Sequence, residues 1–116
     1  MSDRELLELA AKAAGVELIE MPPGVYRNAT GAKPENNPFG LPTWNPLTDD
    51  GDALRLMVRL RLEPRLIDNS HSNGAEPSRV TLHNVAGIVE NIDDDPLAAT
   101  RRAITRAAAE IGRRMT

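Results

Sequence analysis

The strongest constraint on the fold lies between residues 44 and 60, where a turn leads directly into a helix. This stretch reads WNPLTDDGDALRLMVRL and contains the only tryptophan of the chain. Because proline disfavours helical angles at the residue before it, the Asn-Pro pair predicts a turn, and the helix should begin just after it. Thr48 or Asp49 can cap this helix. We interpret the stretch as structural, with five residues of most weight: Trp44, Asn45, Pro46, Asp49 and Asp52.

The side chains that follow predict how this helix is buried. Asp49, Asp50 and Asp52 lie in its first turn, where free backbone N–H groups and the positive end of the helix dipole favour carboxylates. The apolar side chains cover an arc of about 200°, so we expect most of the helix surface to be buried. They are Ala53, Leu54, Leu56, Met57, Val58 and Leu60. Arg61 would fall inside this arc, which predicts that the helix ends near residue 60 or 61.

Two more helices have clear end signals. Ser2 and Glu5 have the spacing of a capping box, and Gly15 is suited to ending the helix that begins there. Near the C-terminus, Asp95 can cap a helix whose first residue is Pro96. In this last helix the apolar residues share one arc, and the arginines lie largely on the other side. The predicted apolar arc contains Leu97, Ile104, Ala107, Ala108, Ile111 and Met115.

Short alternating segments between the helices predict strands. Residues 16–21 and 25–27 flank Pro-Pro-Gly and predict a hairpin or a bent strand. The proline in 63–68 restricts that strand to an edge or to its first residues, and 79–89, with a bulge at Gly87, would pair with it as a long hairpin. Residues 28–43 predict a long irregular loop.

These elements define the expected fold class. We predict an α/β fold of the α+β type, with three amphipathic helices covering a small, mostly antiparallel sheet. The expected order is helix, one or two strands, helix, two strands, helix, in one domain spanning residues 1–116.

Composition narrows the class of protein. The 116 residues carry a net charge of −3 and include no cysteine, which excludes disulfides, a thiolate nucleophile and a cysteine-zinc site. No apolar run approaches the roughly 20 residues that span a bilayer, and the charged N-terminus does not resemble a signal peptide. We therefore expect a cytoplasmic protein that does not enter membranes. The sequence leaves the oligomeric state open, although a homodimer would be unsurprising.

The residues with catalytic potential form no recognisable motif. His71 and His83 lack the spacing of a metal pair, and the aspartates after Thr48 do not follow the alternation of a calcium loop. The serines near His71 have no nucleophile motif around them. We therefore expect no enzyme, no cofactor and no metal site, and we keep a small metal-dependent hydrolase as a lesser alternative.

The arginine side of the last helix is the best candidate for a partner-binding surface. Residues 97–116 contain five arginines and one glutamate, and arginines bind phosphates and carboxylates well. The candidate residues are Arg101, Arg102, Arg106 and Arg113. An acidic protein partner and a nucleic acid or nucleotide are both compatible with them, and so is a simple solvated helix surface.

Three blocks carry a family resemblance: DRELLELAAKAAG at 3–15, WNPLTDDGDALRL at 44–56 and AATRRAITRAAAEIG at 98–112. They resemble small phage and prophage proteins of Gram-negative bacteria, the phage ABA-sandwich group. The resemblance implies an α/β sandwich that acts inside the host cell, and it brings no catalytic residues with it. Together with the lack of site chemistry, it predicts a non-catalytic accessory protein that binds a host or phage protein.

Overall fold

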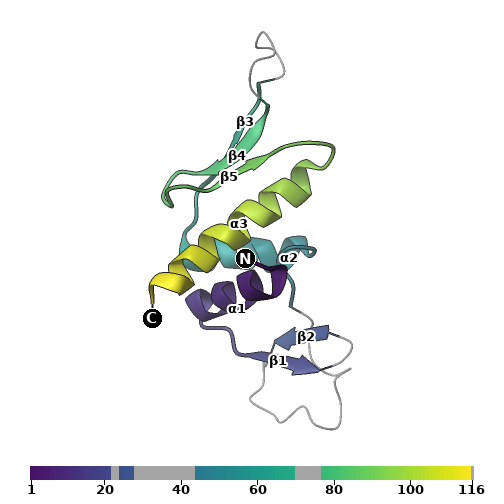
Figure 1. Ribbon diagram of the computed structural model, residues 1–116, viewed down its shortest axis with the longest axis vertical. Helices are drawn as coiled ribbons and strands as arrows, with labels where there is room; N and C mark the ends of the chain where they lie inside the picture. The colour runs from purple at the N-terminus through teal and green to yellow at the C-terminus, as the bar shows by residue number, and fades with distance from the viewer. Residues whose placement is uncertain (22–23, 28–43, 70–76, 116) are drawn as a thin grey trace.

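A computed structural model describes residues 1–21, 24–27, 44–69 and 77–115 (Figure 1). The described residues form an α+β fold with three helices and five strands, which confirms the predicted fold class. The expected loop at 28–43, and His71, lie outside these residues. The elements in chain order are α1 (Asp3–Ala14), β1 (Leu18–Met21), β2 (Gly24–Arg27), α2 (Asp50–Leu60), β3 (Pro64–Ile67), β4 (Arg79–Leu82), β5 (Val89–Asn91) and α3 (Pro96–Arg114).

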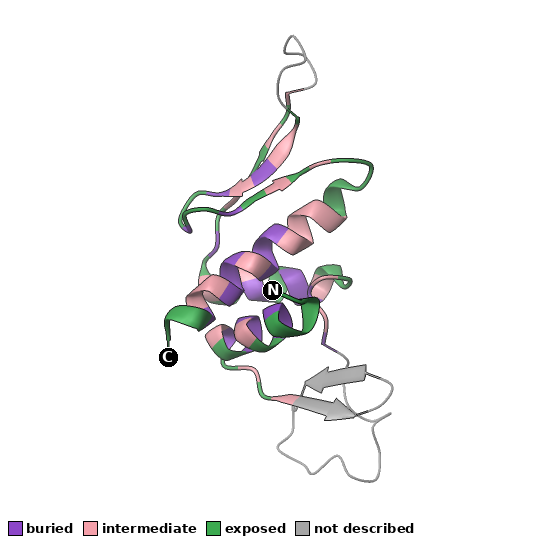
Figure 2. Ribbon diagram, viewed as in Figure 1, coloured by how far each residue is buried: buried purple, intermediate pink, exposed green. Residues whose placement is uncertain are grey.

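Helix α3 lies at the centre of the arrangement. The sheet formed by β3, β4 and β5 packs on one side of it, and α1 and α2 pack on the other (Figure 1). The sequence predicted that all three helices would cover the sheet, whereas α3 makes the main contacts with it. Because α3 is covered from two directions, buried residues occur around much of its circumference (Figure 2). Its buried residues are Ala103, Ile104, Thr105, Ala107, Ala108, Ala109 and Gly112.

Helices α1 and α3 approach each other closely at Gly112. A Cβ atom built on Gly112 would lie 2.0 Å from the carbonyl oxygen of Leu9, so no larger residue fits there without moving a backbone. Ala10 on α1 and Ala107 and Ala108 on α3 are fully buried in the same core. Small residues therefore set the distance between these two helices.

The predicted helix ends are confirmed. The Ser2 hydroxyl accepts a hydrogen bond from the Glu5 N–H at 3.2 Å, and Gly15 ends α1 in the left-handed conformation, at φ 70°. The Asp49 carboxylate caps α2, which ends at Leu60 as expected. The Asp95 carboxylate accepts from the N–H of residue 98 at 3.0 Å, and a proline follows it as the first residue of α3. The capping residues were thus sufficient to predict where all three helices begin.

The strands pair antiparallel throughout. β1 and β2 form a hairpin, and the second sheet has the order β3-β4-β5, so Pro64 does begin an edge strand. The predicted continuation of one strand from 79 to 89 is wrong. β4 ends at Leu82, the chain turns through Gly87 at φ 84°, and β5 returns as a third strand.

The side chain of Asn84 explains why β4 stops. Its Oδ1 accepts from the Glu63 N–H at 3.0 Å, and its Nδ2 donates to the Arg61 carbonyl at 2.7 Å. These two bonds tie residue 84 to the connection between α2 and β3. The chain is therefore held at the end of the sheet. Gly87 is part of a turn and not of a β-bulge.

Two predicted apolar arcs extend onto exposed surface. In α2, Leu54 is 55% exposed and Val58 is 66% exposed, so the expectation that most of this helix is buried is wrong. α2 contacts α3 and α1 on one side only. Leu97, in the first turn of α3, and Met115, which follows its last residue, are exposed because they lie at the two ends of the helix.

Candidate functional site

The turn before α2 is organised around the buried carboxylate of Asp52, whose side chain is 4% exposed. Its Oδ2 accepts from the Asn45 N–H at 2.9 Å, and its Oδ1 accepts from the Arg55 guanidinium at 2.6 Å. The side chain of Asn45 accepts from the Leu47 N–H at 3.0 Å, which closes an Asx turn. The side chains of Asn45, at the start of the turn, and Asp52, in the first turn of α2, thus hold the turn in place.

The indole of Trp44 is packed at the start of this turn. Trp44 is 3% exposed and belongs to the main core together with Leu56 of α2 and Ala14 of α1. Pro46 is fully buried. The turn therefore anchors the N-terminal end of α2 against α1 and α3, and it leaves the outer side of α2 open.

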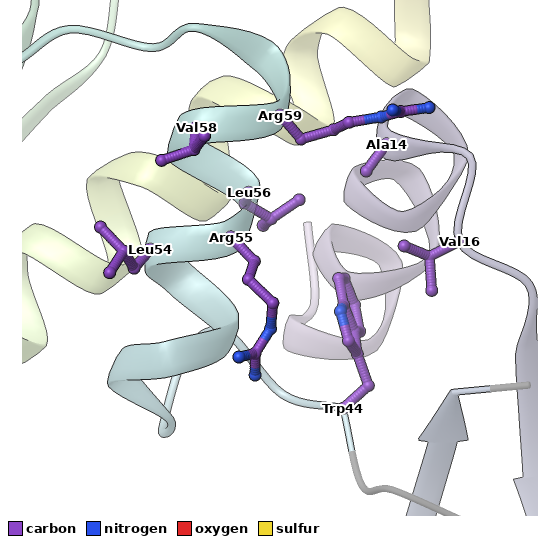
Figure 3. Close-up of a pocket in the computed structure, with 8 residues that line it drawn as sticks. All are labelled: Ala14, Val16, Trp44, Leu54, Arg55, Leu56, Val58 and Arg59. Atoms are coloured by element: carbon purple, nitrogen blue, oxygen red, sulfur yellow. The ribbon is translucent and has the colours of Figure 1, made fainter. Parts of the chain in front are cut away.

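An apolar groove of about 500 Å³ lies between α2 and the C-terminal end of α1 (Figure 3). Trp44 lies at its base and Val16 on the α1 side, while Leu54 and Val58 belong to the α2 side (Figure 3). The complete lining is Ala14, Val16, Trp44, Leu54, Arg55, Leu56, Val58 and Arg59. Its size is within the range of ligand-binding pockets, and its wall is almost entirely hydrocarbon.

Two arginines supply the charge of this groove. Arg55 pairs with Asp52 and lies 3.8 Å from the carboxylate of Asp49. Arg59 extends across to the C-terminal end of α1, where its Nη2 comes within 3.9 Å of the Cβ position of Gly15 (Figure 3). Among the described residues, Arg59 has no ion-pair partner. It lies instead beside the negative end of the α1 dipole.

A second, smaller groove of about 290 Å³ lies between α2 and the first turns of α3. Leu54 lines both grooves, and Leu97, which is 61% exposed, lines the second. We use the name "α2 surface" for Leu54, Val58 and Leu97. It is a stripe of large exposed apolar side chains bordered by two hollows.

The four candidate arginines of α3 are separated into different environments. Arg101 is 17% exposed at the side chain; its Nε donates to the Leu47 carbonyl at 2.9 Å and its Nη1 pairs with Asp50 at 2.7 Å. Arg102 pairs with Asp3 at 3.1 Å and with Glu90 at 3.4 Å. These two arginines thus connect α3 to α2, α1 and β5.

The other two have partners within the chain as well. Arg106 pairs with Glu90 at 3.0 Å and donates to the Val89 carbonyl. Arg113 pairs with Glu110 on its own helix. This pairing holds the pKa of the Glu110 carboxyl below its usual range, chiefly through the hydrogen bond from Arg113, and raises the pKa of Arg113. A nucleic acid would have to compete with these carboxylates for all four guanidinium groups.

The residues with catalytic potential do not converge. His83 is exposed just beyond β4, and its Nδ1 lies 3.4 Å from the Arg65 guanidinium. In the described parts of the chain, no three histidine or acidic side chains are grouped so that they could hold a metal ion. Nor do those parts include a helix with the length and apolar character needed to cross a bilayer.

Sequence reasoning missed the α2 surface, although a signal was present. A surface helix normally has an apolar stripe of about 100° or somewhat more, and the arc of α2 is about twice as wide. An arc of that width is compatible either with burial from two sides or with one buried and one exposed apolar side, and the sequence alone does not separate these cases.

No known protein family, curated protein or solved structure matches the chain. The fold and the surface define an α+β protein with an exposed apolar helix, and the resemblance to phage ABA-sandwich proteins stays a prediction.

Proposed function

We propose that the chain is a non-catalytic accessory protein of a phage or prophage, and that it acts inside the host cell by binding a host or phage protein. The α2 surface is where this binding takes place. The resemblance to small phage proteins supports the biological setting, and the chemistry of the surface supports the mode of action.

The exposure of three large apolar side chains carries this proposal. Leu54, Val58 and Leu97 are between 55% and 66% exposed, beside a hydrocarbon-lined groove. Full burial of a fully exposed side chain of this kind contributes about 1.5–3 kcal/mol, so covering the exposed part of all three would favour a contact by roughly a few kcal/mol. Large exposed apolar patches on small proteins commonly mark interaction sites.

Site-specific photo-crosslinking tests the proposal directly. We expect p-benzoylphenylalanine at position 54, in the protein expressed in Gram-negative cells, to form an adduct with another protein on irradiation. The same residue at position 66, where Leu66 is 58% exposed on β3, is the matched control and should form little. The absence of an adduct with a different protein at position 54, or equal adducts from both positions, would contradict the proposal.

A further inference from the structure

We infer that the α2 surface also binds a second copy of this chain, with the two α2 helices packed side by side and antiparallel. The inference rests on the proposed function, because it names one occupant of the same surface. A different protein would then compete with self-association for Leu54 and Val58.

The residues along the outer side of α2 have a self-complementary order. At about 100° per residue, four helical residues fall within an arc of about 100°: Asp50, Gly51, Leu54 and Val58. Arg61 follows the last turn as the C-cap of α2, in the left-handed conformation. Four of these five residues are exposed, and Gly51 is half-buried. An acid thus lies at the N-terminal end, two apolar side chains lie in the middle, and a cation lies at the C-terminal end.

A two-fold axis beside residue 56 brings complementary groups together. Leu54 then opposes the partner's Val58, and Gly51, which has no side chain, opposes the partner's Arg61. The Asp50 carboxylate, which pairs with Arg101 of α3 and is 67% exposed at the side chain, comes close to the same guanidinium. Because the contact is isologous, each of these pairs occurs twice, as is usual for two-fold dimers.

Charge selects the antiparallel orientation over the parallel one. A parallel pair would place Asp50 beside the partner's Asp50 and Arg61 beside the partner's Arg61, and like charges in close contact repel. No described residue forms an ion pair with Arg61, so this cation is available for a partner's carboxylate.

The size of the contact sets the expected strength. An α2 helix of 11 residues is about 16 Å long, so this face alone buries less than a standard interface. We therefore expect a reversible dimer at the micromolar end of the affinity range, which forms as concentration rises.

Sedimentation equilibrium of the full chain tests the inference. The weight-average mass should rise from monomer to dimer with concentration, and Val58→Lys should weaken association at least about tenfold. Leu66→Lys is the matched control, because it makes the same exchange at a similarly exposed residue on β3, and it should leave the association unchanged. Far-UV circular dichroism and Trp44 fluorescence report whether each variant is folded.

Arg61→Ala tests the orientation. It removes an attraction in the antiparallel dimer and should weaken it, whereas in a parallel dimer it would remove a repulsion and strengthen association. A chain that stays monomeric throughout, equal loss in Val58→Lys and Leu66→Lys, or tighter association in Arg61→Ala would overturn the inference. A monomer that still forms an adduct with a different protein at position 54 would leave the proposed function standing.

Discussion

Three aspartates within four positions have different roles at the start of α2. Asp49 caps the helix, Asp50 pairs with Arg101 of α3, and Asp52 is buried and binds both Asn45 and Arg55. The sequence predicted the capping role because it depends on nearest neighbours. It gave structural weight to Asp49 and Asp52 but did not predict that Asp52 would be buried, since burial depends on where α1 and α3 lie.

Replacement of Asp52 should therefore cost far more than replacement of an exposed aspartate. Asp52→Ala leaves the Asn45 N–H without its acceptor and should lower the free energy of unfolding by about 1–3 kcal/mol. Asp52→Asn retains an acceptor oxygen but loses the charge opposite Arg55, so its effect should be smaller. Urea unfolding followed by Trp44 fluorescence measures both.

Asp94→Ala is the control for this series, because Asp94 is exposed before α3. Its unfolding midpoint should stay close to that of the unchanged protein. If Asp52→Ala were as stable as Asp94→Ala, the buried carboxylate would not hold the turn.

At the scale of elements, α3 combines apolar packing with a set of ion pairs along its sides. Arg101, Arg102 and Arg106 lie where α3 meets α2, α1 and β5, so much of the side that the sequence indicated as a partner surface is an internal junction. The helix bounds were predictable because caps are local. The direction each arginine takes was not, because Asp3, Asp50 and Glu90 come from distant parts of the chain.

The last turn of α3 should give the protein a pH-dependent contribution to stability. Arg113 and Arg114 lower the pKa of Glu110, so the native state binds a proton there less readily than the unfolded chain. The resulting stabilisation is present above the ordinary glutamate pKa of about 4.3 and is lost as the pH falls through the lowered value. The Glu110→Gln variant should thus be less stable than the unchanged protein at pH 7 and equally stable in strong acid.

An NMR titration of the Glu110 carboxyl checks the cause. The midpoint should lie below that of glutamate in an unfolded peptide, and Arg113→Ala should bring it back toward the ordinary value, because Arg113 is the main contributor. A midpoint unaffected by Arg113→Ala would show that this pair does not control the titration.

For the molecule as a whole, the decisive feature is the position of α3 between two layers. The sequence indicated three amphipathic helices and an antiparallel sheet, and these exist. It did not indicate that α1 and α2 would pack on the far side of α3 from the sheet. The run of alanines ending in Gly112 was the available signal, since a helix covered from both sides needs small residues in more than one direction.

Gly112→Ala should therefore reverse the usual effect of this exchange. Alanine in a helix interior is ordinarily favoured over glycine by about 0.5–1 kcal/mol, yet here its methyl group would collide with the Leu9 carbonyl. We expect a loss of about 1–3 kcal/mol as α1 is forced away from α3. The midpoint of thermal unfolding should fall, whether it is followed by Trp44 fluorescence or by amide protection in β4.

Gly51→Ala is the control within a helix. A Cβ at Gly51 would meet only the ends of the Arg55 and Asp49 side chains, at 3.3 Å, and those ends can move. Its stability should change little or rise slightly. Equal destabilisation by both exchanges would mean that the approach of α1 to α3 is not the cause.

The central position of α3 also limits how this chain tolerates changes in length. Inserting one residue after Thr105 would rotate the remainder of the helix by about 100°, which would turn Gly112 away from Leu9 while the ion pair of Arg102 with Glu90 of β5 stayed in place. Because the two layers contact α3 from opposite sides, the helix cannot restore both sets of contacts by rotating about its axis. Insertions and deletions should therefore be confined to the connections, and the nineteen residues of α3 should vary in identity but not in number.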